Sequence, residues 1–277
     1  MPAWAVDAIL AIRHGVRMIT RARTPMALAL ATIGVLVGGA AFGADEEIQV
    51  YMDELGKPGE FGLDVHTSFV ASGDLATNYP GNQPSLHRLR ITPEFAYSLT
   101  NSLELGMYLP LATLDRNGQL GLGGIKFRLK YIAPKAPEDS WFWGVNLELG
   151  RVNHSLDANP VNGELKGIAG TRSGPWTLAF NANVGFKVAG PEASPATIEL
   201  ATKLMHSIGH GASLGIESFN GMGELRSPGH LSDSEQAGFV VLDRPIGRWE
   251  LNLGVGVGYG SNPDRLILKA IIGVPID

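Results

Sequence analysis

The sequence predicts an all-β protein, a transmembrane antiparallel up-and-down β-barrel of about 12 strands that follows a cleaved signal peptide. In residues 248–259, Trp, Leu, Val and Tyr alternate with Arg, Glu, Asn and Gly at every second position. Successive side chains of a strand point to opposite faces, so this stretch has one apolar face and one polar or bare face. The alternation recurs about a dozen times, and an apolar outside around a polar inside is typical of a barrel dissolved in lipid.

The composition of the 277-residue chain agrees with this fold class. Charged residues make up only 18% of the chain, whereas roughly 25% is usual in soluble globular domains. The 36 glycines lie within strand-like runs rather than in a linker. After the amino terminus, no window offers the roughly 18 unbroken apolar residues of a transmembrane helix. The chain has no cysteine, so it has neither disulfides nor thiolate chemistry.

Residues 1–43 are predicted to be a signal peptide. Four arginines precede an apolar run at residues 26–41, and residues 41–43 or 39–41 offer a cleavage site. A membrane anchor is the alternative, but the run is shorter than the ~20 residues that a span needs. Translation from Met18 would shorten the long amino-terminal region. Cleavage after Gly43 leaves 18 basic and 26 acidic residues, a net charge of −8, which argues against a nucleic-acid partner.

The mature chain divides into a short leading segment and the barrel. Residues 44–59 are predicted to be a periplasmic or lumen-entering segment, and residues 60–277 the barrel. Counting from Phe61 gives about twelve strands, an even number as in bacterial barrels. They cover residues 61–69, 88–99, 103–111, 120–131, 141–149, 164–173, 176–187, 198–204, 214–216, 237–241, 248–259 and 266–274. The pattern is weakest at 164–173, and the adjacent glycines 123 and 124 predict a bulge.

Loop lengths predict how the barrel is oriented. Residues 72–85, 153–163 and 223–234 form long links, whereas the turns at 100–102, 174–175, 209–211 and 246–247 are tight. Bacterial outer-membrane barrels have short periplasmic turns and longer extracellular loops, so the carboxyl end is expected in the periplasm. The predicted location is the bacterial outer membrane. The expected partners are outer-membrane lipid and lipopolysaccharide, the barrel-assembly machinery and a small-molecule solute.

The charged residues gather on the parity that faces the lumen, because an Arg or Lys facing acyl chains at mid-depth costs roughly 2–4 kcal/mol. The predicted lumen-lining residues are Asp64, His66, Arg88, Arg90, Glu94, Glu104, Lys126, Arg128, Lys130, Glu148, Lys187, Glu199, Lys203, Glu250 and Lys269. One interpretation is a salt-bridged filling, which the sequence favours because twelve strands lie between filled barrels and open porins of roughly 16–18 strands. The other is a charged solute path, which the clustered positive charges of residues 88–90 and 126–130 support.

A glycine stripe on the last-but-one strand offers room inside the barrel. Gly254, Gly256 and Gly258 leave its inner face without side chains, and bare backbone permits close approach by another segment. Residues 46–55 are therefore a candidate plug that lies on this stripe.

Histidine–serine pairs are the candidates for catalysis. His66 and Ser68 share one face of a strand, as a nucleophile and its base require, but that face points into the lumen. Outer-membrane phospholipase A and lipid A deacylase carry the pair on the lipid side. Asp64 and His66 resemble the Asp-x-His of omptin proteases without a second acidic pair. The pairs at residues 154–155 and 206–207, and His210, lie in or beside loops and turns.

No other signature of chemistry stands out. The chain shows no phosphate loop, zinc spacing, dinucleotide fingerprint or calcium loop. The sequence thus predicts no catalytic residue, metal or cofactor. Outward-facing aromatic residues near strand ends fit either an interfacial girdle or ordinary lipid-facing bulk. They are Trp141, Trp143, Trp176, Trp249, Tyr97, Tyr131 and Tyr259.

Several stretches resemble Gram-negative outer-membrane proteins grouped with the phenol-degradation-pathway (MetA-type) transporter-like barrels. They are residues 47–51, 58–63, 92–97, 105–110, 129–134 and 142–150, which span most of the mature chain. The resemblance implies a location and a shape rather than an activity. One departure is the carboxyl end, Val-Pro-Ile-Asp, where many such barrels end in an aromatic residue that the assembly machinery reads.

These observations predict an outer-membrane channel or transporter that passes a small solute, with an anionic or an aromatic solute as candidates, through a charged lumen. The long loops or the leading segment would gate it. The alternatives are a closed structural barrel without transport and a membrane-embedded lipid hydrolase.

Overall fold

The computed structural model describes residues 47–77, 79–109, 112–191 and 194–276. The predicted signal peptide, residues 1–43, lies outside the described residues, so its cleavage stays a prediction. In the described part of the chain, no helix is long and apolar enough to cross a membrane.

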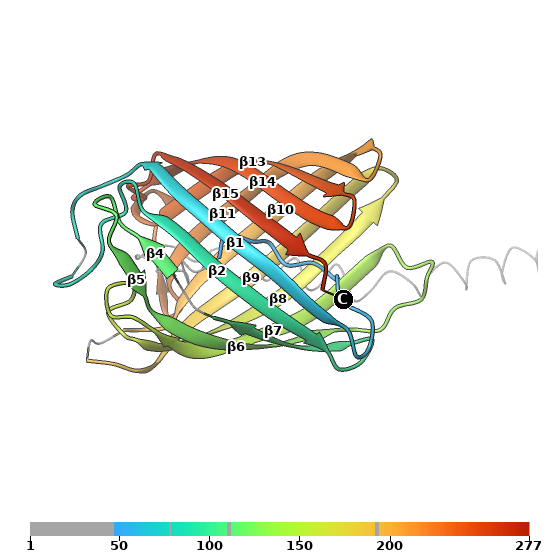
Figure 1. Cartoon of the computed structure of the whole chain (residues 1–277), viewed down its shortest axis with the longest axis horizontal. Helices are drawn as coiled ribbons and strands as arrows, with labels where there is room; N and C mark the ends of the chain where they lie inside the picture. The colour runs from blue at the N-terminus through green and yellow to red at the C-terminus, as the bar shows by residue number, and fades with distance from the viewer. Residues whose placement is uncertain (1–46, 78, 110–111, 192–193, 277) are drawn as a thin grey trace, which may run out of the picture. The chain divides into compact units, whose positions relative to one another are not determined.

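The strands form one antiparallel sheet that closes on itself (Figure 1). The first strand, β1 (Phe61–Ser72), pairs with β2 (Leu89–Ser98) along one edge and with the last strand, β15 (Leu266–Val274), along the other. The first and last strands of the described barrel therefore meet without an open seam, which is what a sheet in hydrocarbon requires.

The other strands follow one another around the barrel in chain order. They are β3 (Leu103–Tyr108) with β4 (Ala112–Leu114), β5 (Leu120–Leu122) with β6 (Gly124–Ile132), β7 (Trp141–Val152), β8 (Val161–Ser173), β9 (Trp176–Ala189), β10 (Thr197–Gly209), β11 (Ala212–Glu224), β13 (Glu235–Ile246) and β14 (Trp249–Gly260). β3 and β4 both pair with β2 and act as one strand, as do β5 and β6; β12 (Ser227–Pro228) pairs only with β11. The barrel therefore has 12 strands, and the predicted fold class is confirmed.

The predicted glycine bulge separates β5 from β6. Leu122 of β5 and Phe127 of β6 both point outward, 60% and 56% exposed, although five positions separate them and a regular strand would put them on opposite faces. Gly124, between them, has a φ of 140°, a conformation that glycine adopts without a steric penalty. The bulge thus restores the outward direction of the apolar side chains along β6.

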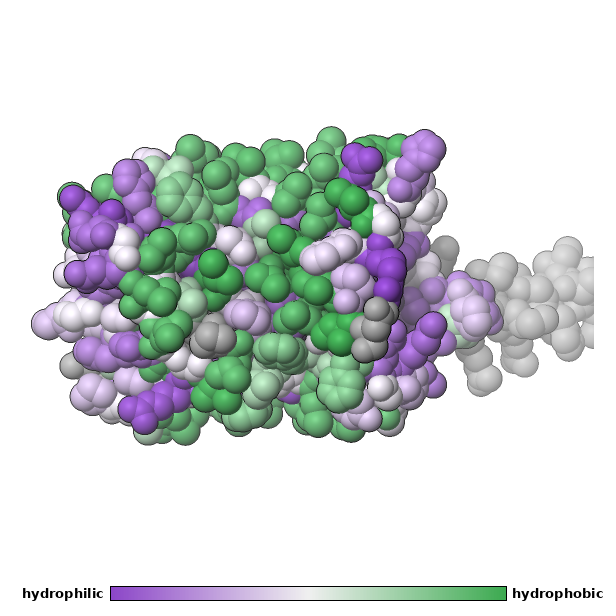
Figure 2. Space-filling view, viewed as in Figure 1, coloured by the Kyte–Doolittle hydropathy of each residue, from purple (hydrophilic) through white to green (hydrophobic). Residues whose placement is uncertain are grey.

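The outside of the barrel carries an apolar belt. Figure 2 shows hydrophobic side chains over the middle of the barrel wall and hydrophilic ones towards both ends. Outward residues such as Leu105 and Val255 are exposed to the extent of 44% and 55%, which suits contact with lipid rather than with water. Trp141, Trp176 and Trp249 each begin a strand at the same end of the barrel, where an interfacial aromatic girdle would lie.

Loops differ in length between the two ends. Residues 73–88, 153–160 and 225–234 join strands at one end, here called the loop end. Residues 99–102, 174–175, 210–211 and 247–248 join them at the other, the turn end, near which the described chain also finishes. The barrel therefore has the asymmetry from which the orientation was predicted.

The lumen is more apolar than the sequence predicts. In β13, Phe239 and Val241 are buried in the barrel and Val240 is 59% exposed, so this strand carries apolar residues on its inner face as well as on its outer face. The cause lies in the adjacent strand: Gly256 pairs with Phe239, and a Cβ at Gly256 would collide with the Phe239 ring. The bare glycine gives the ring its space in the lumen.

Candidate functional site

Residues 47–55 of the leading segment lie in the lumen of the barrel. Val50 and Tyr51 are only 2% and 3% exposed and pack with inward side chains such as Phe142 and Ile168. The backbone N–H of Tyr51 donates to Asn181 Oδ1 at 2.6 Å, and Asn181 Nδ2 donates to the Tyr51 carbonyl at 2.9 Å. One asparagine of β9 thus satisfies both backbone groups of Tyr51. Residues 47–55 are called the lumen segment below.

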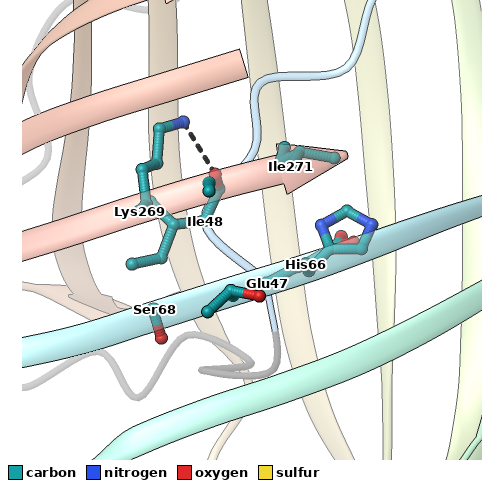
Figure 3. A pocket seen from close by; sticks show the side chains of 8 residues that line it. Glu47, Ile48, His66, Ser68, Lys269 and Ile271 are labelled. Atoms are coloured by element: carbon teal, nitrogen blue, oxygen red, sulfur yellow. Dashed lines mark hydrogen bonds between the residues drawn. The ribbon is translucent and has the colours of Figure 1, made fainter. Parts of the chain in front are cut away.

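Lysines of the wall hold the backbone of the lumen segment at two further points. Lys269 of β15 donates to the Ile48 carbonyl at 2.8 Å (Figure 3), and Lys130 of β6 donates to the Glu54 carbonyl at 2.8 Å. The lumen segment belongs to no strand of the sheet, so buried backbone groups must find partners among side chains. Where it passes His66 and Lys269, the remaining cavity is only about 10 Å³, roughly the space of one water.

The three carboxylates of the lumen segment pair with cations of the wall. Glu47 lies 3.1 Å from Lys166 Nζ. Asp53 lies 2.7 Å from Lys135 Nζ and 2.6 Å from Arg172 Nη2, and the same guanidinium reaches Glu54 at 3.3 Å. Burial raises the pKa of Asp53, but the hydrogen bonds and charges of Arg172 and Lys135 outweigh it and hold that pKa below its usual value.

The ring of Tyr51 lies among three cations. Lys166 Nζ is 4.3 Å from the ring centroid, Lys130 Nζ 5.3 Å and Arg128 Cζ 5.7 Å. Cations within about 6 Å of an aromatic face are attracted by its quadrupole, more strongly when water is excluded. The Tyr51 hydroxyl lies 2.5 Å from the Tyr108 hydroxyl, and both hydroxyls donate to Glu47 Oε2, at 3.1 and 3.0 Å.

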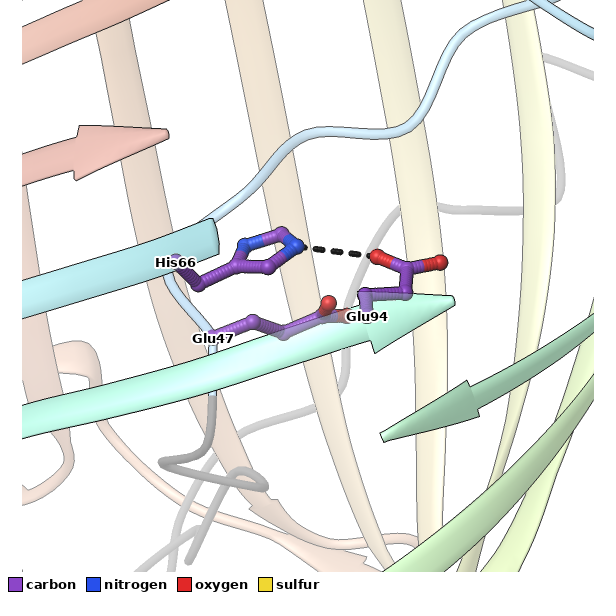
Figure 4. A group of neighbouring side chains, drawn as sticks. All are labelled: Glu47, His66 and Glu94. Atoms are coloured by element: carbon purple, nitrogen blue, oxygen red, sulfur yellow. Dashed lines mark hydrogen bonds and ion pairs between the residues drawn. The ribbon is translucent and has the colours of Figure 1, made fainter. Parts of the chain in front are cut away.

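The charged side chains of the wall around the Tyr51 ring also form ion pairs with one another. Arg128 Nη2 bridges Glu94 at 2.5 Å and Glu104 at 2.8 Å. His66 Nε2 lies 2.9 Å from Glu94 Oε2 (Figure 4), and the Ser98 hydroxyl donates to Glu104. All five side chains are buried, so the pairing offsets the large desolvation cost of the charges.

Lys166 forms three ion pairs. Besides Glu47, it pairs with Glu148 at 3.4 Å and with Glu164 at 2.9 Å. On the opposite side of the lumen, Lys203 pairs with Glu217 at 3.3 Å and with Asp243 at 2.8 Å, and Lys269 also pairs with Glu217.

Three carboxylate and imidazole groups approach the spacing of a metal site. Ligand atoms of Glu47, His66 and Glu94 all lie within 4.8 Å of one another (Figure 4). Each carboxylate already has a cationic partner, Lys166 for Glu47 and Arg128 for Glu94. Since a metal would have to displace these ion pairs, we assign the group to the charge network.

The predicted lumen-lining residues differ in how exposed they are in the structure. Ten are buried: His66, Arg90, Glu94, Glu104, Lys126, Arg128, Lys130, Glu148, Lys203 and Lys269. Four are partly exposed: Asp64, Arg88, Lys187 and Glu199. Glu250 is exposed, and it lies at the turn end beside Gly273 and near Asp64. The buried ones divide between the network around Arg128 and Lys166 and the smaller one around Lys203.

Several residues that face the lumen were not predicted from the sequence. Glu164 and Lys166 lie in the strand whose pattern was weakest, because Ile168 faces inward while Gly167 faces outward and blurs the alternation. Glu217 is buried, and its parity opposite Leu214 could have identified it. Tyr51 offered no such signal, since the lumen segment has no periodicity that fixes a face.

The glycine stripe does not hold the lumen segment, so that part of the plug hypothesis is wrong. The nearest atoms to a Cβ at Gly254 belong to Lys269, and those at Gly256 to Phe239. At Gly258 they belong to Asn262 and the Asp264 carbonyl, in the connection to β15. Large neighbours on β13 and β15 fill the stripe before the segment can reach it.

The histidines have partners other than serine. His66 bonds to Glu94 rather than to Ser68. The His206 ring packs edge-on against Trp176 at 4.4 Å, and the His154 ring lies 5.2 Å from Tyr79. These contacts orient the rings for packing and ion pairing.

The closed sheet and its apolar belt define the class: this is a transmembrane β-barrel of the bacterial outer membrane. No family model matches the chain, and no curated protein matches it. Among solved structures it is similar to the KdgM porin, with a TM-score of 0.52 and 10% identity over 78% of this chain and 99% of that one.

Two further structures are similar. The KdgM porin in complex with disordered oligogalacturonate matches with a TM-score of 0.51 and 10% identity over the same shares of the two chains. Outer membrane phospholipase A from Escherichia coli matches with a TM-score of 0.43 and 12% identity over 83% of this chain and 93% of that one, too distant to support an argument. At these identities the likeness shows the fold alone.

Proposed function

We propose that this protein is an outer-membrane channel for a small anionic or aromatic solute, and that the lumen segment closes it in the state seen here. The proposal rests on one observation: a segment of the chain itself, and not only side chains of the wall, fills the lumen. A barrel closed by its own wall would have no room for another nine residues, whereas this wall encloses residues 47–55. A space of that width becomes a passage once the segment withdraws.

The attachment of the lumen segment supports a removable closure. It joins β1 through residues 56–60, where Gly59 has a φ of 87° and is exposed. Side chains of the wall, not strand pairing, hold it in place. Its withdrawal would leave all strand pairs of the barrel intact.

The comparisons support the proposal without fixing the solute. A porin with the same fold has been seen with oligogalacturonate, and the wall here offers cations whose present partners belong to the lumen segment. We also propose, on the stretches given above, that the chain belongs with the phenol-degradation-pathway (MetA-type) transporter-like barrels. A closed structural barrel, in which the segment is a permanent filling, is the second candidate.

Planar-bilayer recording of the chain from residue 44 and of the same chain without residues 47–55 separates these candidates. The deletion should raise single-channel conductance and increase the permeability of chloride relative to potassium. Heat-modifiable electrophoretic mobility checks that both barrels are folded. If folded barrels lacking the segment stayed non-conducting, the channel proposal would fail and the closed structural barrel would stand.

A further inference from the structure

We propose that Tyr51 and Glu47 occupy a binding site for a small aromatic carboxylate, formed by Arg128, Lys130, Lys166 and Tyr108 of the wall. The solute and the chain's own lumen segment would compete for one place. The inference rests on the proposed channel function and adds to it the chemistry of the solute and the side chains that bind it.

The first part of the site recognises an aromatic ring. Three cations surround the Tyr51 ring at 4.3 to 5.7 Å, and Phe142 and Ile168 of the wall belong to the adjoining apolar cluster. Cation–π attraction is stronger in a desolvated site than at an exposed one. A saturated side chain would gain only the apolar contact here.

The second part recognises a carboxylate beside the ring. Glu47 accepts hydrogen bonds from Lys166 and from the hydroxyl of Tyr108. Lys166 therefore contacts both the carboxylate and the ring, which ties the two features together. The Tyr51 hydroxyl also donates to Glu47, so ring and carboxylate lie within one hydrogen bond of each other.

Withdrawal of the lumen segment would take away partners of two buried lysines of the wall. Lys166 pairs with Glu47 of the lumen segment at 3.1 Å, and it would lose this partner if the segment withdrew. The hydrogen bond of Lys130 goes to Glu54 of the lumen segment, and an isolated buried ammonium is costly. Withdrawal of the segment therefore leaves a site that favours an anion.

Competition follows from this shared occupancy. A ligand shifts an equilibrium only by its differential affinity for the two states, and an aromatic carboxylate would bind only when Tyr51 and Glu47 have left. The solute would thus keep the segment out of the lumen while it is bound.

The experiment uses the absence of cysteine from the chain. Val50→Cys places a thiol at a position that is 2% exposed when the lumen segment is in place. Maleimide labelling of the detergent-solubilised mature chain then reports withdrawal. Lys57→Cys, at an exposed position of the same leading region, is the matched control. Benzoate is the probe, and benzamide and acetate are the neutral and the non-aromatic comparisons.

Benzoate should accelerate labelling of Val50→Cys by about tenfold at ten times its Kd, and leave Lys57→Cys unchanged. Benzamide and acetate should have little effect. In the chain without residues 47–55, benzoate should produce transient blocks of the current. If that barrel conducts but benzoate changes neither labelling nor current, or if acetate acts as strongly as benzoate, this inference is wrong while the channel function stands. If that barrel is folded and does not conduct, the channel function itself fails.

Discussion

The two sides of the lumen wall hold the same segment by different chemistry. The charged arc consists of the inward side chains of β2, β3, β6, β7 and β8, with Arg128 and Lys166 at its centre. The apolar arc consists of Met205, Phe239 and Ile267 of β10, β13 and β15, which pack with Ile48 of the segment. The side chains of the charged arc contact the segment through charge partners, whereas those of the apolar arc contact it through packing, beside one hydrogen bond from Lys269 to the Ile48 carbonyl.

The two arcs differ in how many of their contacts they would lose if the lumen segment withdrew. The apolar arc keeps its internal packing, because Phe239 fits against Gly256 whether or not Ile48 is present. The charged arc loses the partners of Lys130 and part of those of Lys166. Lys269 would also lose the Ile48 carbonyl but would keep Glu217, so the charged arc is the side that changes more when the lumen segment leaves.

The largest effect is expected from breaking the charged arc itself. Arg128→Met should lower the free energy of unfolding by about 3–5 kcal/mol, because Glu94 and Glu104 would remain buried without their shared cation. Urea unfolding in detergent, followed by tryptophan fluorescence, measures the change. A loss below about 1 kcal/mol would mean that water or another cation replaces Arg128, and that this arc is less dry than the structure indicates.

A smaller effect is expected on the apolar arc. Gly256→Ala should destabilise the barrel by about 1–3 kcal/mol, because its Cβ would collide with the Phe239 ring. Gly167→Ala is the matched control: the nearest atom to its Cβ is the Ala182 carbonyl at 3.8 Å, an ordinary contact. Equal unfolding curves for the two variants would show that Phe239 has another position available.

Lys130→Met tests one contact between the charged arc and the lumen segment, and it leaves the ion pairs of that arc in place. It removes the hydrogen bond to the Glu54 carbonyl, and a bond from a charged donor contributes about 1.5 kcal/mol or more. Labelling of Val50→Cys should therefore accelerate about tenfold. The barrel's mobility on electrophoresis should be unchanged, and an unchanged labelling rate would show that the contact adds nothing to closure.

The smallest effect is expected at the turn end, where Asp53 is partly exposed. Its pKa is lowered from 3.8 by Arg172 and Lys135, so its contribution to closure is fully present above pH 3.8 and is lost as the pH falls through the lowered value. Labelling of Val50→Cys relative to that of Lys57→Cys, which corrects for the smaller thiolate fraction in acid, should rise by no more than about fivefold across that window. Asp53→Asn should already label faster at neutral pH and respond less to acid.

The alternation of apolar and polar residues at every second position determined most of the fold from local sequence. A side chain of β7 or β14 faces lipid or lumen by its parity alone, so the alternation gave the strands, the even number and the buried positions of residues such as Glu94, Lys126 and Glu148. The glycine bulge before β6 was equally local. The signal peptide, the boundary at residue 60 and the family resemblance stay predictions.

Only the tertiary structure decided which charges meet and what fills the lumen. Arg128 finds Glu94 and Glu104 through the register of β2, β3 and β6, and alternation fixes the face of a side chain but not which side chain of the next strand lies beside it. The apolar inner face of β13 depends on Gly256 of β14, which leaves room for the Phe239 ring. Residues 47–55 carry no periodicity, so their place follows from the side chains that close around them, which belong to strands from β3 to β15.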